Sequence, residues 1–202
     1  LNSNQLRAIS IVEENGIYYG FIVDSQLNKL YRVDFGNSLT NNPQAATEIF
    51  SGSPLNTPYQ ISTVSEGSFK FIFISNQGDG KLTRLKFETS YSDPVSESIQ
   101  ISVTGNWING ISFLKENDRW YCLTASPFLS EIQKLDFVGG IDDNSPVVTS
   151  IPIASNPMGI QLVNENGYYY DFDSGSFIGA NDQVLSLDGV PAYGFNRSWQ
   201  NR

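Results

Sequence analysis

"KLYRVDFGNSLTNNP", residues 29–43, begins as a strand pattern and ends as a polar loop. Apolar and polar residues alternate up to Phe35, which is typical of a half-buried strand. Gly36 and an Asn-rich run follow, and Pro43 blocks further strand pairing. Related runs return later in the chain: "KLTRLKFE" from Lys81, "EIQKLDFV" from Glu131 and "QVLSLDGV" from Gln183. The stretch is therefore one strand of a unit that occurs four times.

The unit recurs about every 50 residues. Its first run begins at Ile9, Ile61, Ile111 and Ile160, which are 52, 50 and 49 residues apart. An aromatic-rich run follows ("IYYGFIVD" in the first unit), then the run above, then in three units a fourth run such as "AATEIFSG". All alternate with period two and are rich in β-branched and aromatic residues, as strands are. Short Gly and Asn joints suit tight hairpins, and we expect almost no helix.

Four antiparallel strands in about 50 residues match a β-propeller blade. We predict an all-β propeller of four four-stranded blades in one repeat domain, at residues 6–56, 57–107, 108–157 and 158–202. An arc of a larger ring is the alternative, since rings of five to eight blades are also common. The fourth unit is degenerate, and terminal repeats are often atypical.

The two faces of the third run differ. One face is apolar and is expected to pack against a neighbouring unit; it carries Val33 and Phe35, Leu85 and Phe87, Leu135 and Phe137, and Leu185 and Leu187. The other face is charged or polar and is expected to be at least partly solvated; it carries Arg32 and Asp34, Arg84 and Lys86, Lys134 and Asp136, and Ser186 and Asp188. The aromatic second runs are expected to pack mainly between blades.

Composition excludes several classes of function. The 202-residue chain is 40% hydrophobic and 13% aromatic, which indicates a globular domain rather than a disordered one. Its net charge of −9 argues against nucleic acid, which needs clustered Lys and Arg. It has no His, the commonest general base and metal ligand. We expect Cys122 to be buried and, without a long apolar run, no membrane insertion.

"LYRVDFGNSLTNNP" resembles a repeat of very large surface and secreted proteins of Bacteroidetes, including gliding-motility-associated and type IX-secreted ones. The preceding "IYYGFIVD" is similar to the aromatic strand of that repeat. The match is close in the first unit and weakens through the later ones. The resemblance implies a propeller-like module exported to the cell surface or the medium for adhesion or assembly. We therefore expect an extracellular or cell-surface location, and a chain that is a mature form or a piece of something longer.

The acidic residues are candidates for metal ligands and for catalysts. "DFDSGSFIGAND" places Asp171, Asp173 and Asp182 at three positions of a calcium loop, but its sixth residue is not Gly and its twelfth is not Glu. We expect no metal and no cofactor. One set of carboxylates recurs beside the first hairpin of the units: Glu13, Glu14, Glu66, Glu116 and Glu165. Repeat symmetry spreads these around a rim, whereas glycoside hydrolysis needs two carboxyl groups about 5–10 Å apart. We therefore predict no catalytic residues.

The connections between units are the best candidates for binding. "SPLNTPYQ", "TGNWING" and "SNPMG" are expected to meet at one mouth of the propeller axis, beside the joints between second and third runs. Trp107 stands in a Gly-flanked loop, and exposed aromatic residues often anchor interfaces. The predicted ligand- or partner-binding residues are Tyr59, Asp79, Trp107, Asn109, Phe128, Asn156 and Met158.

The function predicted from these observations is a non-catalytic interaction or scaffold module. It would bind a protein or a glycan at the cell surface through the mouth loops, and would act within a larger chain or assembly. Two alternatives stay open: a carbohydrate-active hydrolase or lyase on a propeller, and a structural subunit of a secretion or surface assembly.

Overall fold

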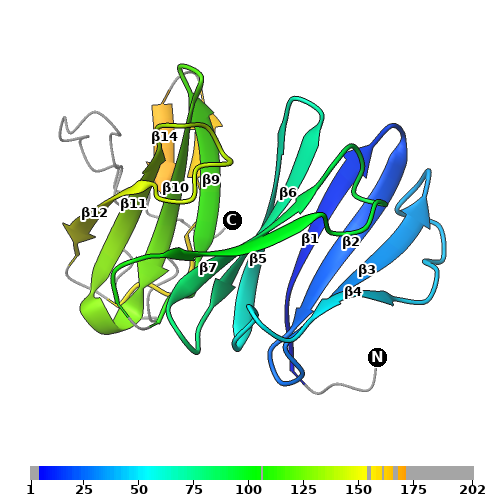
Figure 1. Cartoon of the computed structure of the whole chain (residues 1–202), viewed down its shortest axis with the longest axis horizontal. Coiled ribbons are helices and arrows are strands. Elements are labelled where there is room, and N and C mark those ends of the chain that lie inside the picture. The colour runs from blue at the N-terminus through cyan, green and yellow to red at the C-terminus, as the bar shows by residue number, and fades with distance from the viewer. Residues whose placement is uncertain (1–4, 106, 154–155, 161, 166–167, 172–202) are drawn as a thin grey trace, which may run out of the picture.

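The computed structural model describes residues 5–105, 107–153, 156–160, 162–165 and 168–171 (Figure 1). Within these ranges the chain is built of antiparallel strands with a single short 3-10 helix, η1 (Pro127–Leu129). The prediction of an all-β fold with four-stranded antiparallel sheets is confirmed. No helix among the described residues is both long and apolar enough to cross a membrane.

Three sheets have the same simple topology, in which each strand pairs with the next. Sheet A contains β1 (Leu6–Glu14), β2 (Ile17–Asp24), β3 (Lys29–Gly36) and β4 (Thr47–Ser51). Sheet B contains β5 (Pro58–Glu66), β6 (Phe69–Asn76), β7 (Lys81–Phe87) and β8 (Glu97–Ser102). Sheet C contains β9 (Ile111–Glu116), β10 (Arg119–Ser126), β11 (Glu131–Phe137) and β12 (Val147–Pro152). A hairpin of β13 (Leu162–Glu165) and β14 (Tyr168–Asp171) follows; the rest of the predicted fourth blade lies outside the described residues.

The repeat phase is fixed by the hairpin between the first two strands of each sheet. Glu14 pairs with Ile17 across a two-residue turn, in which Asn15 and Gly16 have φ of 52° and 80°. Both values lie in the left-handed region that Asn and Gly adopt most readily, as a type I′ turn requires. The same two-residue closure recurs at the end of β5, β9 and β13. The period seen in the sequence is therefore a period of the backbone.

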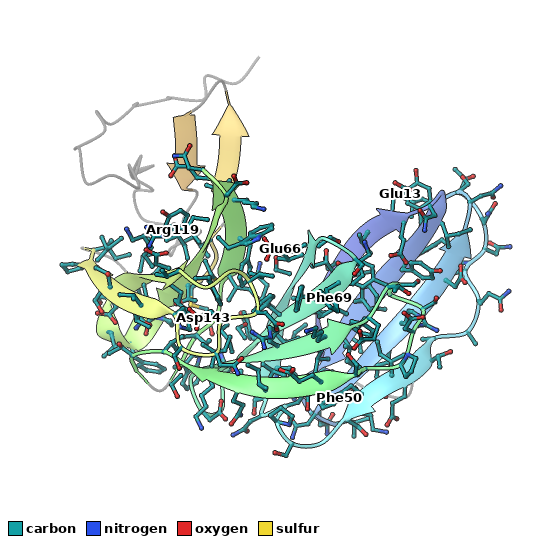
Figure 2. The ribbon with its side chains drawn as sticks, turned by 45° about the horizontal axis from the view of Figure 1, so that its top comes forward. Glu13, Phe50, Glu66, Phe69, Arg119 and Asp143 are labelled. Carbon is teal, nitrogen blue, oxygen red and sulfur yellow. The ribbon has the colours of Figure 1, made fainter. Side chains whose placement is uncertain are left out.

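The sheets stand face to face and follow an arc, with the β13–β14 hairpin continuing it beyond sheet C (Figure 2). One apolar core lies between sheets A and B, a second between B and C, and a third between C and Ile160 of the next unit. The aromatic residues on the second strand of each sheet pack against the next sheet. Phe21, on β2 of sheet A, packs in this way against sheet B. The face of sheet B that packs against sheet A carries Leu85 and Phe87, the apolar pair predicted from the third run, and both are fully buried. This is the packing of neighbouring propeller blades.

A second contact ties each sheet to the loop between the third and fourth strands of the next sheet. That loop carries one large buried residue, Tyr91 in sheet B and Ile141 in sheet C, each 1% exposed. We call it the anchor residue. Glu14 of sheet A accepts a hydrogen bond from the N–H of Tyr91 at 3.1 Å, and Arg32 donates to its carbonyl at 2.8 Å. The anchor residue is thus held at both of its backbone polar groups.

Sheet B holds the anchor residue of sheet C in the same way. Glu66 accepts from the N–H of Ile141 at 3.1 Å, and Arg84 donates to its carbonyl at 3.2 Å. Arg84 is 1% exposed and also contacts Glu97 and Asp142 at 3.0 and 2.9 Å. The expectation of a solvated face is therefore wrong for Arg84, because the neighbouring blade's loop covers it. The recurring glutamates are likewise more than a solvated rim, since two of them join adjacent blades.

Candidate functional site

Three connections meet at the end of the sheets opposite the first hairpins, which we call the mouth. They are the β8–β9 connection, the β10–β11 joint that contains η1, and the β12–β13 connection. Trp107 of the first packs against Phe128 of the second, with ring centroids 4.5 Å apart and a 60° interplanar angle. Phe128 is 70% exposed, Met158 of the third connection is 40% exposed, and Trp107 is half-buried. These three side chains form an exposed apolar group, the mouth patch.

The buried residue Asn109 contacts two residues of the mouth patch, Trp107 and Met158, and fixes their positions. Its side-chain oxygen accepts hydrogen bonds from Trp107 Nε1 and Gln77 Nε2, both at 2.9 Å. Its amide nitrogen lies 3.4 Å from Met158 Sδ, and its backbone carbonyl accepts from Ser75 Oγ at 2.7 Å. Asn109 is fully buried, so these bonds occupy its polar groups inside the protein. Its role is to orient the patch, because a buried side chain that is already bonded has little left to offer a ligand.

The β8–β9 and β12–β13 connections approach each other closely at Gly110. A side chain added there would place its Cβ 2.6 Å from the backbone nitrogen of Ile160 and 3.0 Å from Gly159. Only Gly tolerates such an approach between backbones. The close contact brings Met158 next to Asn109, and therefore next to Trp107.

The other predicted site residues lie around the mouth patch rather than in it. Asn156 accepts a hydrogen bond from Ser130 Oγ at 2.9 Å, beside η1. Tyr59 lies on β5, and the guanidinium carbon of Arg7 lies 5.7 Å from the centroid of the Tyr59 ring. Asp79 accepts a hydrogen bond at 2.9 Å from Nε2 of Gln100, which lies on β8, the outer strand of sheet B. Of the predicted site residues, the structure thus brings together four: Trp107, Asn109, Phe128 and Met158. It also places Gln77 beside them. The sequence pointed to Gln77 only through its position in the joint between a second and a third run.

Carboxylates at the mouth end of the sheets come from three successive hairpins. Asp24 is fully buried, and one of its oxygens accepts the N–H groups of Gln26 and Leu27, both at 2.9 Å. Asp79 and Glu131 are half-buried. In the described part of the chain no three His, Cys, Asp or Glu side chains are grouped to hold a metal ion. Of the candidate calcium loop, Asp173 and Asp182 lie outside the described residues.

The carboxylates at the opposite end are engaged in charge-assisted bonds. Burial raises the pKa of Glu66, but hydrogen bonds from the indole N–H of Trp120, the N–H of Ile141 and Lys115 outweigh it, and the pKa is lowered overall. A group held in its ionised form is a poor proton donor, so Glu66 is unsuited to act as a general acid. Its hydrogen bonds join sheet B to the blade of sheet C instead.

No protein-family model matches the sequence, and no curated protein matches it either. Solved structures match the fold. A GH43 β-xylosidase/α-arabinofuranosidase from a compost microbial metagenome, in complex with xylotriose, aligns with a TM-score of 0.62 at 10% identity, over 84% of this chain and 70% of that one. An α-L-arabinofuranosidase from Clostridium thermocellum aligns with a TM-score of 0.62 at 13% identity, over 91% of this chain and 68% of the other.

An exo-β-1,3-galactanase from Phanerochaete chrysosporium, with β-1,3-galactotriose, aligns with a TM-score of 0.63 at 14% identity and covers 96% of this chain. The chain spans only half of that enzyme's length, 50%. At these identities the likeness is one of fold.

These comparisons overturn two predictions, that the chain is a non-catalytic interaction module and that it is not an enzyme. The solved proteins that share its arrangement of sheets are hydrolases of glycosidic bonds, the class that the sequence analysis held as an alternative. The physical reason is that repeat symmetry keeps apart only the carboxylates that recur in every blade, whereas an active site can draw single residues from connections that differ between blades.

Proposed function

We propose that the chain is part of a carbohydrate-active β-propeller that binds an oligosaccharide at its mouth and hydrolyses a glycosidic bond there. The observation that carries the proposal is the fold shared with glycoside hydrolases, two of them solved with trisaccharides. The mouth patch supports it, because Trp107 and Phe128 present aromatic surface at the end of the sheets where the connections vary most.

The mouth patch suits a sugar ring for a physical reason. The C–H groups of a pyranose carry partial positive charge and pack favourably on the electron-rich face of an aromatic ring. Phe128 is the most exposed of the large hydrophobic residues in the described part of the chain, and Trp107 is fixed beside it by Asn109. A site that is already ordered loses less conformational entropy when a ligand binds.

Hydrolysis requires two carboxyl groups on either side of the scissile bond, about 5–10 Å apart. The described carboxylates at the mouth end that are partly exposed are Asp79 and Glu131, and these are the first to test. The amides Asp79→Asn and Glu131→Gln keep the shape of each side chain and remove its proton chemistry. Glu13→Gln, at the opposite end, is the matched control.

The experiment is to incubate the chain with xylotriose, arabino-oligosaccharides and β-1,3-galactotriose and to follow the release of reducing sugar. We expect turnover of at least one of them, lowered by at least about a hundredfold in one amide variant, since general acid–base catalysis contributes roughly 10²–10⁴-fold. Trp107→Ala and Phe128→Ala should each weaken binding, while Leu39→Ala, at an exposed residue on the opposite end of sheet A, should not. Absence of both binding and turnover on all three substrate classes would refute the proposal.

Two further statements belong to the proposal. The four repeat units are blades of one ring, with β13–β14 opening the fourth, as the 50-residue period predicts. The resemblance of residues 30–43 to exported Bacteroidetes repeats supports an extracellular or cell-surface location, where polymeric glycans are met. Fractionation of cells that produce this protein naturally tests the location.

A further inference from the structure

The junction of sheets A and B differs from the junction of sheets B and C in how its arginine is neutralised. Arg84, in the B–C junction, is bonded by three acceptor side chains at 2.8–3.0 Å: Glu97, Asp142 and Asn144. Arg32 stands at the same repeat position in the A–B junction, and its Nη1 donates to the carbonyl of the anchor residue at 2.8 Å. Within the described ranges, no carboxylate forms an ion pair with Arg32, and no acceptor bonds its Nε or Nη2.

The acceptors around Arg84 have no counterparts around Arg32 because three residues differ between the repeats. The same backbone hydrogen bond precedes the fourth strand of sheets A and B: Gln44 to Asp34, and Ser96 to Lys86. It aligns Ala45 of sheet A with Glu97 of sheet B. Counting from the anchor residues aligns the other two positions: Ser92 with Asp142, and Pro94 with Asn144. No carboxylate or amide stands at any of the three, and Arg32 lines an open groove instead.

This groove has a volume of about 640 Å³ and lies between β4 and the β7–β8 connection, which reaches across to sheet A (Figure 1). Its walls are Arg32, Ile49, Phe50 and residues 92–98. Ligand pockets commonly have volumes of about 300–1,000 Å³. Ile49, Phe50 and Val95 also pack against the core between the two sheets, so these walls are ordered before a ligand binds.

A bulge in β4 shapes the groove. Between Glu48 and Phe50, which pair with successive residues of β3, Ile49 is an extra residue without a partner on that strand. Successive side chains of a regular strand point to opposite faces, whereas the bulge lets both Ile49 and Phe50 line the groove. The equivalent strand of sheet B, β8, keeps an unbroken register. A bulged edge is a poor template for strand addition, so the groove is not built for an extended peptide.

The guanidinium of Arg32 is held in position from two sides. The carbonyl of Tyr91 accepts from Nη1, and the ring centroid of Tyr19 lies 5.8 Å from the guanidinium carbon. The donors that remain are on Nε and Nη2, which lie side by side and match the two oxygens of a carboxylate. Arg32 is therefore prepared for one carboxylate group that the protein itself does not supply within the described ranges.

The other walls of the groove suit a sugar. Phe50 and Val95 offer apolar surface, on which the C–H groups of a pyranose pack favourably. Asp93 bonds Thr89 and Ser90 through Oδ2. Glu97 pairs with Arg84 through Oε1. The second oxygen of each carboxylate can accept a sugar hydroxyl group, and the two negative charges repel a dianion such as phosphate.

We propose that this groove binds a hexuronic acid residue of an acidic glycan. The sugar carboxylate pairs with Arg32, the pyranose ring packs against Phe50, and its hydroxyl groups donate to Asp93 and Glu97. The groove contains no residue of the mouth patch, so the site is separate from the proposed site of hydrolysis and does not depend on it.

Titration of the full chain with D-glucuronate, followed by NMR signals of the backbone and of the arginine side chains, tests the proposal. D-Glucose is the matched ligand, because it carries a hydroxymethyl group in place of the carboxylate. Salt at about 0.15 M screens the acidity of the rest of the chain beyond roughly 8 Å. Glucuronate should shift the signals of Arg32 Nε–H and of residues 92–98, and should bind at least about tenfold more tightly than glucose, because charge-assisted hydrogen bonds are about twice as strong as neutral ones.

The decisive variant is Ala45→Glu, which offers Arg32 the carboxylate that Glu97 gives to Arg84. It should weaken glucuronate binding at least about tenfold, since the new carboxylate competes for the same charged donors. The variant adds a counter-charge and removes no contact of Arg32, so the chain should stay folded. Ser92→Asp, at the position of Asp142, provides the same test by a second route. The control is Gln26→Glu, which adds the same charge at an exposed residue of the β2–β3 joint and should leave binding unchanged.

Several results would overturn the inference. Equal affinities for glucuronate and glucose would show that the carboxylate is not recognised, and unchanged binding in both Ala45→Glu and Ser92→Asp would place the sugar elsewhere. Acetate or phosphate that binds as tightly as glucuronate would indicate an adventitious ion only. Tighter binding of a peptide with a free C-terminal carboxylate would assign the groove to a protein partner. Shifts confined to Trp107 and Phe128 would assign the sugar to the mouth patch. Hydrolysis is measured on neutral trisaccharides, so failure of either proposal leaves the other standing.

Discussion

Removal of the Glu66 carboxylate should loosen the junction between sheets B and C. Glu66 accepts hydrogen bonds from the N–H of Ile141 at 3.1 Å and from Trp120 Nε1 at 2.9 Å, and it pairs with Lys115 at 3.2 Å. Hydrogen bonds to a charged group contribute about 1.5–3 kcal/mol each, and an exposed ion pair about 0–1 kcal/mol. The Glu66 side chain is 32% exposed, so water replaces part of what is lost.

We therefore expect Glu66→Ala to lower the free energy of unfolding by about 2–3 kcal/mol, and Glu66→Gln, which keeps one acceptor oxygen, by roughly half of that. In a chain of this size the alanine variant should melt about 4–12 °C lower. Urea unfolding followed by tryptophan fluorescence gives the free energy, provided that its denaturant dependence stays unchanged.

The control is Glu13→Ala, since Glu13 is exposed at the tip of the neighbouring β1–β2 hairpin and bonds only within it (Figure 2). The pH dependence gives a second arm. The pKa of Glu66 is lowered in the folded state, so its contribution is complete above the ordinary value of 4.5 and is lost as the pH falls through the lower folded value. The gap between the unaltered chain and Glu66→Gln should therefore close in acid. A loss in Glu66→Ala within about 0.5 kcal/mol of that in Glu13→Ala, a difference typical of ordinary surface sites, would refute the reasoning.

Three other predictions follow from the blade junctions. Burial raises the pKa of Tyr91 to about 12, so stability should hold below pH 10 and fall as the pH rises toward 12; Tyr91→Phe should remove that loss in urea unfolding, and an unchanged loss would count against it. Arg84→Met should cost about 1.5–3 kcal/mol, because it removes the charged donor from the buried carbonyl of Ile141 while Glu97 and Asp142 stay partly exposed to water; Lys29→Met, at an exposed ion pair, should leave the free energy of unfolding almost unchanged. Cys122 should react with a thiol reagent only after unfolding, and a fast reaction in native buffer would contradict its burial.

The strands and their faces could be read from the sequence because they depend on local alternation. Val33 and Phe35 repeat as Leu85 and Phe87, and a period of two fixes which face each occupies. The hairpin phase was equally local, since Asn15 and Gly16 supply the positive φ that the turn needs. Such features are decided within a few residues.

The contacts between blades could not be read in the same way. Arg84 alternates like a surface residue, yet it is buried because the loop at residues 141–144 of the next sheet folds over it. Asn109 was predicted to face a partner, and it is fully buried because connections from three units meet around it. Trp107 and Phe128 were both identified, but their contact depends on the placement of two loops that are far apart in the chain. These outcomes depend on how one sheet is set against the next, which alternation does not encode.

Sugar release from defined trisaccharides tests the central claim most directly. The purified chain should liberate reducing sugar from xylotriose or β-1,3-galactotriose, and Trp107→Ala should reduce the rate at low substrate concentration while the protein stays folded by circular dichroism. A folded chain that neither binds nor cleaves these sugars or arabino-oligosaccharides would contradict the assignment.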